Sequence, residues 1–319
     1  MYQLRDYLSM LSDENRISAY ADAIRSQVKP GDRVIELGAG FGFFSILAVR
    51  AGAAFVDAVD VNPVVHLGPR IAAANGYADR IRFHQLDLLR FQPDARADVV
   101  IGDLRGPTPF VRRSLEVMID ARTRMLRDGG QVIGRKDILY VAPVRHPAAF
   151  RRIVVDPVTR SDVNLSPAAT VVVDTPFQCT VARGDLVAPA ASWGELDYER
   201  LDTTSHCGSA EWKLDDQLQI DGLAIWFEAD LGGGIRLSSG PGGSTTTYAQ
   251  MYLPLRAPVE VEPAERLRVD LAARYSAGEY VWTWSVQISD ANAVCRIRHT
   301  QNSLAERIID PAAFETAAL

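Results

Sequence analysis

Four carboxylates in the first third of the chain each follow a short apolar run that is typical of a β-strand; they are Glu36, Asp60, Asp87 and Asp103. If these strands are parallel, their carboxyl ends lie along one edge of a sheet, which is where ligands bind in folds of this kind. A carboxylate at that edge can accept hydrogen bonds from two ribose hydroxyls, and we expect this role for Asp60. The four acids together indicate a ligand site more strongly than any one of them does.

A glycine-rich turn follows the first of these acids and contains Gly38, Gly40 and Gly42. Glycine allows the backbone to turn sharply and to approach a ligand closely. A dinucleotide-binding turn has the spacing G-x-G-x-x-G, but its third glycine would stand where this chain has Phe43. The spacing G-x-G-x-G after an acid instead resembles the turn that binds S-adenosylmethionine (SAM) in class I methyltransferases. A purely structural turn in another α/β protein is the alternative interpretation.

The composition is that of an ordinary soluble enzyme, with 47% hydrophobic and 23% charged residues among 319. A net charge of −6 gives no general affinity for nucleic acid. The N-terminus lacks the apolar run of a signal peptide, and no window is long and apolar enough to span a membrane. Three cysteines and five histidines show no metal-ligand spacing, so we expect no metal site and a reducing cytoplasmic location.

Apolar periodicity divides the chain into two parts. Residues 4–27 have helical spacing, and strands then alternate with helices to about residue 144, which predicts a parallel sheet with helices on both faces. The elements expected there are strands at 33–37, 55–60, 81–86, 97–101 and from 131, and helices from 43, at 64–75 and at 110–126. From about residue 205 the period is two, which predicts antiparallel strands joined by glycine-rich loops, at 222–229, 249–255, 266–272 and 280–288.

Several segments resemble the protein arginine methyltransferases, and the resemblance covers nearly the whole chain. The stretch 10–16 (MLSDENR), followed by Tyr20, is similar to the family's helix that closes over SAM. Three later stretches also follow the family pattern, at 121–130 (ARTRMLRDGG), 222–227 (GLAIWF) and 238–241 (SSGP).

The resemblance implies an α/β fold in which a Rossmann-like SAM-binding domain precedes an antiparallel β-barrel domain. The implied division is a helical lid at 1–30, the SAM-binding domain at 31–144 and the β-barrel substrate domain at 145–319, with a dimerisation arm at about 156–187. A protein of this kind is expected to be a homodimer, with SAM as its cofactor and S-adenosylhomocysteine as the product.

The resemblance also assigns roles to single residues. It implies that Arg16 pairs with the SAM carboxylate, that Asp87 and Leu88 border the adenine, and that Met10 forms a wall of the acceptor pocket. We expect Glu36 to lie near the methionine amino group, although it could instead cap the following helix.

The residues that would face the methyl acceptor depart from the family pattern. Arginine methyltransferases hold the substrate guanidinium with two glutamates, and this sequence has Asp103 at the first position and Arg112 at the second. The family's Thr-His-Trp motif reads Thr-Thr-Tyr at 246–248, so the histidine that would pair with Asp13 is missing. Arg112 either meets the acceptor, pairs with Asp103 or points to solvent.

These departures predict a SAM-dependent methyltransferase whose acceptor is a nitrogen of a small molecule or peptide other than a simple arginine side chain. In that prediction Asp103, Met10 and Arg112 are the catalytic candidates, and Asp103 accepts a proton or stabilises the developing cation. Guanidine methylation of protein or free arginine is the first alternative, and a SAM-binding protein without activity is the second. We expect no nucleic acid or membrane as a partner.

Overall fold

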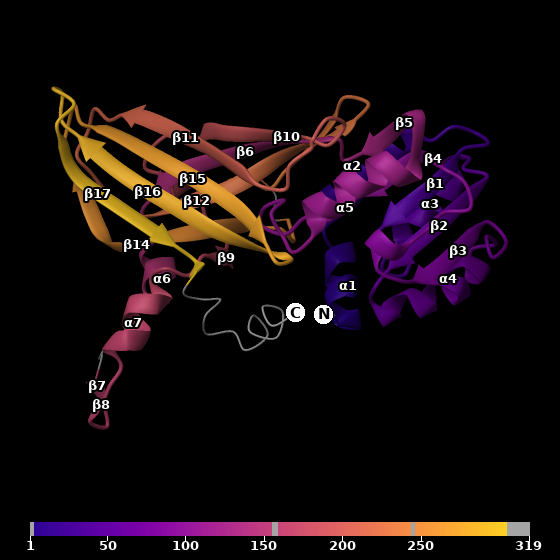
Figure 1. Cartoon of the computed structure of the whole chain (residues 1–319), viewed down its shortest axis with the longest axis horizontal. Coiled ribbons are helices and arrows are strands. Elements are labelled where there is room, and N and C mark those ends of the chain that lie inside the picture. Colours follow the sequence, from indigo (N-terminus) through magenta and orange to yellow (C-terminus); the bar gives the residue numbers. More distant parts are fainter. Residues whose placement is uncertain (1–2, 155–158, 244–245, 305–319) are drawn as a thin grey trace.

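The computed structural model describes residues 3–154, 159–243 and 246–304, and it places two halves side by side along the longest axis (Figure 1). The first half contains a five-stranded parallel sheet in the order β3-β2-β1-β4-β5. Its strands are β1 (Arg33–Leu37), β2 (Phe55–Asp60), β3 (Ile81–Gln85), β4 (Ala97–Gly102) and β5 (Leu126–Ile133). Their valine, isoleucine and leucine side chains are buried, which is typical of a parallel sheet covered on both faces. The predicted α/β fold is confirmed.

Helices precede and cover this sheet. They are α1 (Leu4–Leu11), α2 (Glu14–Gln27), α3 (Phe43–Ala51), α4 (Gly68–Ala74), which follows the 3-10 turn η1 (Pro63–Leu67), and α5 (Ser114–Asp120), which continues into the π turn η3 (Ala121–Met125).

Two of the expected helices differ from the structure. Residues 4–27 form two helices, because the Asp13 side chain accepts a hydrogen bond from the Arg16 amide and so starts α2 anew. The helix expected from residue 110 begins only at Ser114, after a stretch that contains Pro107 and Pro109.

The second half consists of antiparallel strands. One sheet has the order β10-β6-β12-β14-β9, with β13 paired to β12, and the other has the order β11-β15-β16-β17. The bounds are β6 (Lys136–Val144), β9 (Phe177–Cys179), β10 (Ala191–Asp197), β11 (His206–Lys213), β12 (Leu218–Gly232), β13 (Ile235–Ser238), β14 (Gln250–Val261), β15 (Arg266–Ser276), β16 (Glu279–Ser289) and β17 (Cys295–Asn302).

The four antiparallel strands expected after residue 205 are confirmed as parts of longer strands. The strand Lys136–Val144, however, pairs with β10 and β12 and belongs to the second half, although the sequence analysis assigns it to the first. Its apolar run would suit a strand of either sheet, so the sequence does not show where the chain leaves the parallel sheet. The chain does so near Gly134 rather than at residue 144.

An arm projects from the second half between β6 and β9 (Figure 1). It contains α6 (Pro147–Phe150), the two-stranded hairpin β7 (Thr159–Arg160) and β8 (Val163–Asn164), and α7 (Ser166–Val172). It lies where the resemblance puts a dimerisation arm, although residues 156–158 of that expected segment are outside the described part of the chain.

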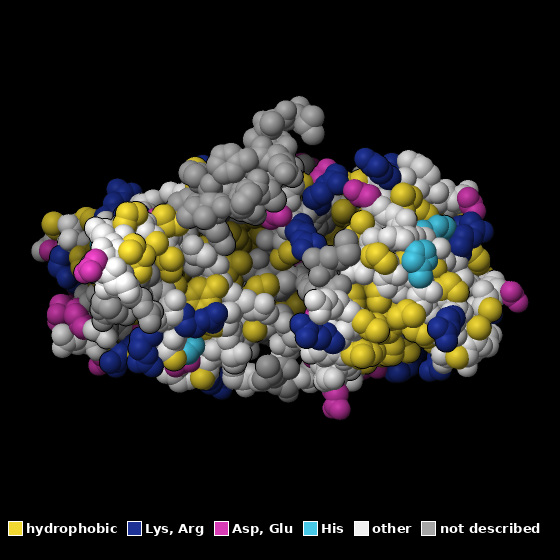
Figure 2. Space-filling model, turned by 90° about the horizontal axis from the view of Figure 1, so that it is seen from below, with side chains coloured by type: hydrophobic (Ala, Val, Ile, Leu, Met, Phe, Trp, Pro, Cys, Tyr) yellow, Lys and Arg dark blue, Asp and Glu magenta, His cyan; other side chains and the backbone are white. Residues whose placement is uncertain are grey.

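Seen from the side of the arm, the surface carries a patch of hydrophobic side chains over the half that holds the parallel sheet (Figure 2). Among the described residues, no helix has the length and apolar character required to cross a membrane.

Candidate active site

The glycine turn between β1 and α3 has the backbone conformation that its sequence predicts. Gly38, Gly40 and Gly42 have φ values of 69°, 56° and 83°, a region that other residues adopt only with strain. A Cβ at Gly40 would lie 2.8 Å from the ring of Tyr7 on α1, so the first helix packs directly on this turn. The turn and α1 therefore enclose the carboxyl edge of β1 together.

Asp60 at the end of β2 fixes this turn. Its carboxylate accepts hydrogen bonds from the amides of Gly40 and Asn62, both at 2.7 Å, and the side chain is buried. Burial raises the pKa of Asp60, and the two amide hydrogen bonds oppose that rise. A carboxylate has further lone pairs, so Asp60 can still accept hydrogen bonds from a ligand.

Glu36 is buried at the end of β1 and caps α3, which is the second of the two roles considered for it. Its Oε2 accepts hydrogen bonds from the amide and the hydroxyl of Ser45, at 2.8 and 2.5 Å. Its Oε1 accepts no hydrogen bond from any described residue. Burial raises the pKa of Glu36 to about 7, against the opposing effect of Ser45. Glu36 therefore gains or loses its proton near neutrality and keeps one oxygen for a ligand.

Asp87 and Leu88 lie just beyond β3. Asp87 caps the 3-10 turn η2 (Leu88–Arg90) by accepting a hydrogen bond from the Leu89 amide, and it also pairs with Arg113 at 3.0 Å. Leu88 is half-buried against the core. Because both Asp87 oxygens already accept hydrogen bonds, an adenine amino group would share this carboxylate with Arg113.

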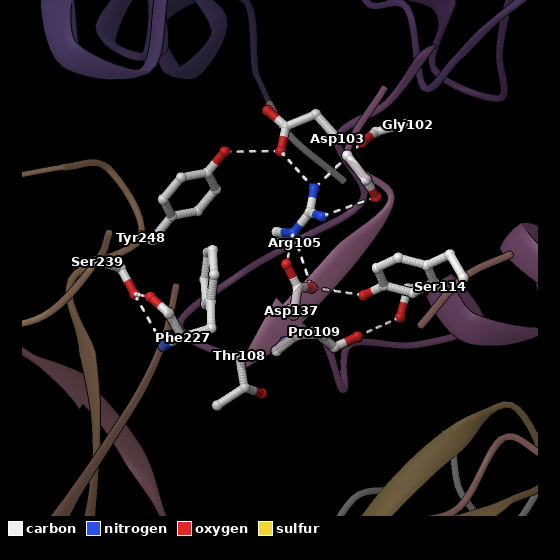
Figure 3. A network of polar contacts seen from close by, with 12 residues as sticks. Gly102, Asp103, Arg105, Thr108, Pro109, Ser114, Asp137, Phe227, Ser239 and Tyr248 are labelled. Atoms are coloured by element: carbon white, nitrogen blue, oxygen red, sulfur yellow. Dashed lines mark hydrogen bonds and ion pairs between the residues drawn. The ribbon is translucent and has the colours of Figure 1, made fainter. Parts of the chain in front are cut away.

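Asp103 lies directly after β4, and its carboxylate is surrounded by side chains of this chain (Figure 3). Arg16 from α2 donates its Nε–H to Oδ2 at 2.6 Å, and Tyr248 donates its hydroxyl to Oδ1 at 2.6 Å. A second guanidinium, of Arg105, comes within 3.7 Å of Oδ1. Burial raises the pKa of Asp103, but the charges of Arg16 and Arg105 outweigh it and hold that pKa below its usual range. Asp103 is therefore a permanent anion and a poor proton acceptor.

Arg105, which the sequence analysis did not select, is the centre of a second buried network (Figure 3). Its Nε–H donates to both oxygens of Asp137 on β6, at 3.0 and 2.9 Å, and Asp137 also accepts the hydroxyl of Tyr198 at 2.6 Å. Nη1 donates to the Tyr20 hydroxyl and Nη2 to the Gly134 carbonyl. This network joins the loop after β4 to the second half of the protein.

The missing histidine has a structural substitute. Asp13, which the resemblance pairs with that histidine, accepts hydrogen bonds from the amide and the hydroxyl of Thr247 at 2.7 and 3.1 Å. The neighbouring Tyr248 reaches Asp103, so the Thr-Thr-Tyr segment ties both α2 and the loop after β4 to the second half.

The other two catalytic candidates lie at the margin of this arrangement. Met10 is half-buried, and its carbonyl accepts a long hydrogen bond of 3.4 Å from Arg16. Arg112 is exposed, has a φ of 47° and makes no hydrogen bond or ion pair with a described residue. Of the three alternatives considered for Arg112, the pair with Asp103 is not formed, and the exposed side chain is open to solvent and to an acceptor.

Within the described ranges there is no group of three or more His, Cys, Asp or Glu side chains that could hold a metal ion. Arg16 keeps a guanidinium nitrogen, Nη2, that bonds to no described residue, although Nε and Nη1 are engaged. Nη2 could therefore bind the carboxylate of a ligand while Arg16 still holds Asp103.

Two parts of the chain match known protein families. Residues 138–309, more than half of the chain, match the PRMT5 oligomerisation domain family, and residues 20–133 match the ribosomal protein L11 methyltransferase (PrmA) family. The chain belongs to the arginine methyltransferase-like family. It is a SAM-dependent methyltransferase, with S-adenosylhomocysteine as the product of its donor.

Individual proteins are similar to this chain over most of its length. An arginine N(omega)-methyltransferase of Streptomyces achromogenes subsp. streptozoticus is 25% identical over 285 residues, covering 84% of this chain and 75% of that protein. The PRMT1 enzyme-prozyme complex of Trypanosoma brucei has a TM-score of 0.82 at 20% identity, covering 93% of this chain and 97% of that one. Protein arginine methyltransferase 10 of Arabidopsis thaliana also gives 0.82, at 18% identity, with 94% and 98% covered.

The left-handed backbone at Arg112 gives a stability prediction. Arg112→Gly should be more stable than Arg112→Ala by about 0.5–1 kcal/mol, because glycine adopts a positive φ without the strain that alanine keeps. Urea denaturation of the two variants measures this difference. Equal stabilities would mean that residue 112 leaves the left-handed region when its side chain is shortened.

The raised pKa of Glu36 predicts pH-dependent cofactor binding. If Glu36 receives the amino group of SAM, it must be ionised, so below its pKa of about 7 a proton has to leave on binding. SAM affinity should then fall by up to about tenfold for each pH unit below neutrality. Calorimetric titration between pH 6 and 8, about one unit either side of that pKa, would measure the change in SAM affinity. Glu36→Gln should bind SAM more weakly and lose this dependence; a dependence that persists in Glu36→Gln would assign it to another group.

Proposed function

We propose that the protein transfers the SAM methyl group to a nitrogen of a small molecule or peptide that is not a simple arginine side chain. The observation that carries this proposal is the occupation of the Asp103 carboxylate. Both of its oxygens accept short hydrogen bonds from Arg16 and Tyr248, and Arg105 lies beside them. An incoming guanidinium finds no free carboxylate oxygen pair at this position.

Charge supports the same conclusion. A guanidinium is held best by two carboxylate oxygens that accept two parallel N–H groups. Here the nearest charges to Asp103 are two buried arginines, with exposed fractions of 12% for Arg16 and 3% for Arg105. Like charges at short range in a water-poor site repel strongly. Asp137 balances the charge of Arg105, and the position of the second family glutamate holds Arg112. Among the described residues, this cluster therefore offers an incoming guanidinium no unpaired carboxylate.

The residues of this chain position the reactants, and bound SAM supplies an activated methyl group. The glycine turn, Asp60 and Glu36 would hold the donor, and Nη2 of Arg16 would bind its carboxylate. Met10 would border the acceptor. Attack in line with the breaking bond requires alignment above all, and that alignment is the largest part of the expected rate. Asp103 contributes as a fixed anion near the site where positive charge develops on the acceptor, and not as a base.

Guanidine methylation of protein or free arginine is the second candidate. The Streptomyces relative, an arginine N(omega)-methyltransferase by name, favours it. In this case Arg16 would have to leave Asp103 when SAM binds, so that the carboxylate could receive the substrate.

Labelled methyl transfer from SAM separates the two candidate functions. The wild-type protein is incubated with free arginine, with an arginine-containing peptide and with fractionated extract of the source organism, and labelled products are identified by mass spectrometry. We expect label in a compound of the extract and little in either arginine substrate. Efficient labelling of arginine or of the peptide would overturn the proposal, and so would the absence of label from every compound of the extract.

We also propose that the protein is a homodimer joined through the arm. The match to the PRMT5 oligomerisation domain supports self-association, and the arm carries exposed apolar residues such as Val163 at its tip. Sedimentation equilibrium should give twice the mass of the chain, which is 35.0 kDa. Deletion of residues 155–175 should give a monomer; a dimer that survives this deletion would require another interface.

A further inference from the structure

The loop between β4 and α5 carries Asp103 at its start and Arg112 near its end, and side-chain contacts hold it at both ends. At its start, Arg105 is held by Asp137 and by the carbonyl of Gly102. At its end, the hydroxyl of Ser114 donates to the Pro109 carbonyl at 2.5 Å. A further, apolar contact joins the loop to the second half of the protein.

Phe110 is the residue that makes this contact. Its side chain is 3% exposed and lies among four rings of the antiparallel strands, with centroids at 5.4 Å for Tyr280 and Trp282, 5.9 Å for Trp193 and 6.2 Å for His206. These separations are those of favourable aromatic pairs. We call Tyr280, Trp282, Trp193 and His206 the aromatic cage.

Burial of Phe110 dictates where the following residues lie. The backbone must turn outward again before α5 begins, and it does so through Arg112, with a φ of 47° and an exposed side chain. Arginine adopts this conformation only when surrounding contacts hold it. The aromatic cage supplies such contacts two residues earlier, and Ser114 supplies them two residues later.

We propose that Phe110 is a positioning residue that holds the loop between β4 and α5, here named the acceptor loop, against the aromatic cage. Its ring contacts are with the aromatic cage, so it acts on Asp103 through the loop. The cage thus couples the second half of the protein to the acceptor side of the site, independently of the Arg105 network. This inference rests on the proposed function in one respect, namely that this loop faces the methyl acceptor.

Hydrogen–deuterium exchange of the full-length protein tests whether Phe110 anchors the loop, and it needs no methyl acceptor. Phe110→Ala should raise amide exchange in residues 104–113 by about tenfold or more, because the loop loses its buried contact. SAM affinity should stay within about twofold, because α3 and the glycine turn are unaffected. Transfer of label to the extract acceptor should fall by about tenfold or more, because a misplaced acceptor loop loses alignment. Phe110→Leu, which keeps an apolar side chain, should restore most of the rate.

A matched control separates local loosening from general loss of stability. Leu267 on β15 is also fully buried and pairs with Ile288, and it lies about 20 Å along the strand from the residue opposite Trp282, six residues away. Leu267→Ala should lower the melting temperature and leave exchange in the loop unchanged. Unchanged loop exchange in Phe110→Ala would overturn the anchor, and raised exchange with full transfer activity would overturn its role in positioning. If the wild-type protein transfers no label to any acceptor, the proposed function fails while the exchange result still decides the anchor.

Discussion

Replacing Arg105 by methionine should lower the free energy of unfolding by about 3–5 kcal/mol, because it leaves the Asp137 carboxylate buried without its cation. Asp137 is fully buried, and Arg105 is 3% exposed. Arg105 donates to both oxygens of Asp137, to two backbone carbonyls and to the Tyr20 hydroxyl, whereas methionine can replace only the apolar part of these contacts. Urea denaturation monitored by circular dichroism measures the change.

A second substitution shows whether the loss comes from the unpaired charge. Arg105→Met combined with Asp137→Leu should recover at least half of the stability lost in the single variant, because the Asp137 carboxylate is then no longer buried without its cation. Recovery should be incomplete, since the Tyr198 hydroxyl loses its acceptor, at a cost of about 1–3 kcal/mol.

Arg135→Met is the matched control for loss of an arginine. Arg135 pairs with Asp230 at 2.8 Å, but its side chain is 45% exposed, so the change should be within about 1 kcal/mol. If the Arg105 and Arg135 variants lose equal stability, the buried network is not a major source of stability. If the double variant is as unstable as the single one, packing rather than charge explains the loss.

Local sequence patterns were enough to predict the parallel sheet and its ligand edge. The alternation of apolar runs with glycine turns involves only residues that are close together in the sequence. The positive φ at Gly40 and the position of Asp60 follow from such local patterns. The antiparallel strands after residue 205 were predictable for the same reason, since a period of two needs only a few consecutive residues.

The pairing of the charged residues was not predictable in this way. Arg105 and Asp137 are 32 positions apart and meet only because β6 crosses into the second half, a crossing that an apolar run cannot reveal. Counting along the loop aligns Arg112 with the second family glutamate but does not give the direction of its side chain. Its outward direction depends on Phe110 entering the aromatic cage, and nothing in the loop itself signals a partner on β16. The break between α1 and α2 could have been predicted from the sequence, because Asp13 is a good N-cap.

Asp103→Asn should reduce methyl transfer by about 100-fold or more while SAM affinity changes by no more than about threefold. The substitution keeps the size of the side chain and removes the anion that accepts the Arg16 Nε–H and the Tyr248 hydroxyl. Positive charge passes from sulfur to the acceptor during transfer, so loss of a fixed anion there raises the barrier more than it weakens donor binding. Labelled transfer to the extract acceptor and calorimetric titration with SAM measure the two effects.

The pH dependence of the wild-type rate distinguishes an anion from a base at this position. Arg16 and Arg105 hold the pKa of Asp103 below its usual range, so Asp103 stays ionised and the rate should show no titration that Asp103→Asn removes. Asp22→Asn, on the exposed side of α2, controls for the loss of one negative charge. Transfer in Asp103→Asn within a few fold of wild type would mean that Asp103 holds Arg16 and Tyr248 in place and has no electrostatic part in the reaction.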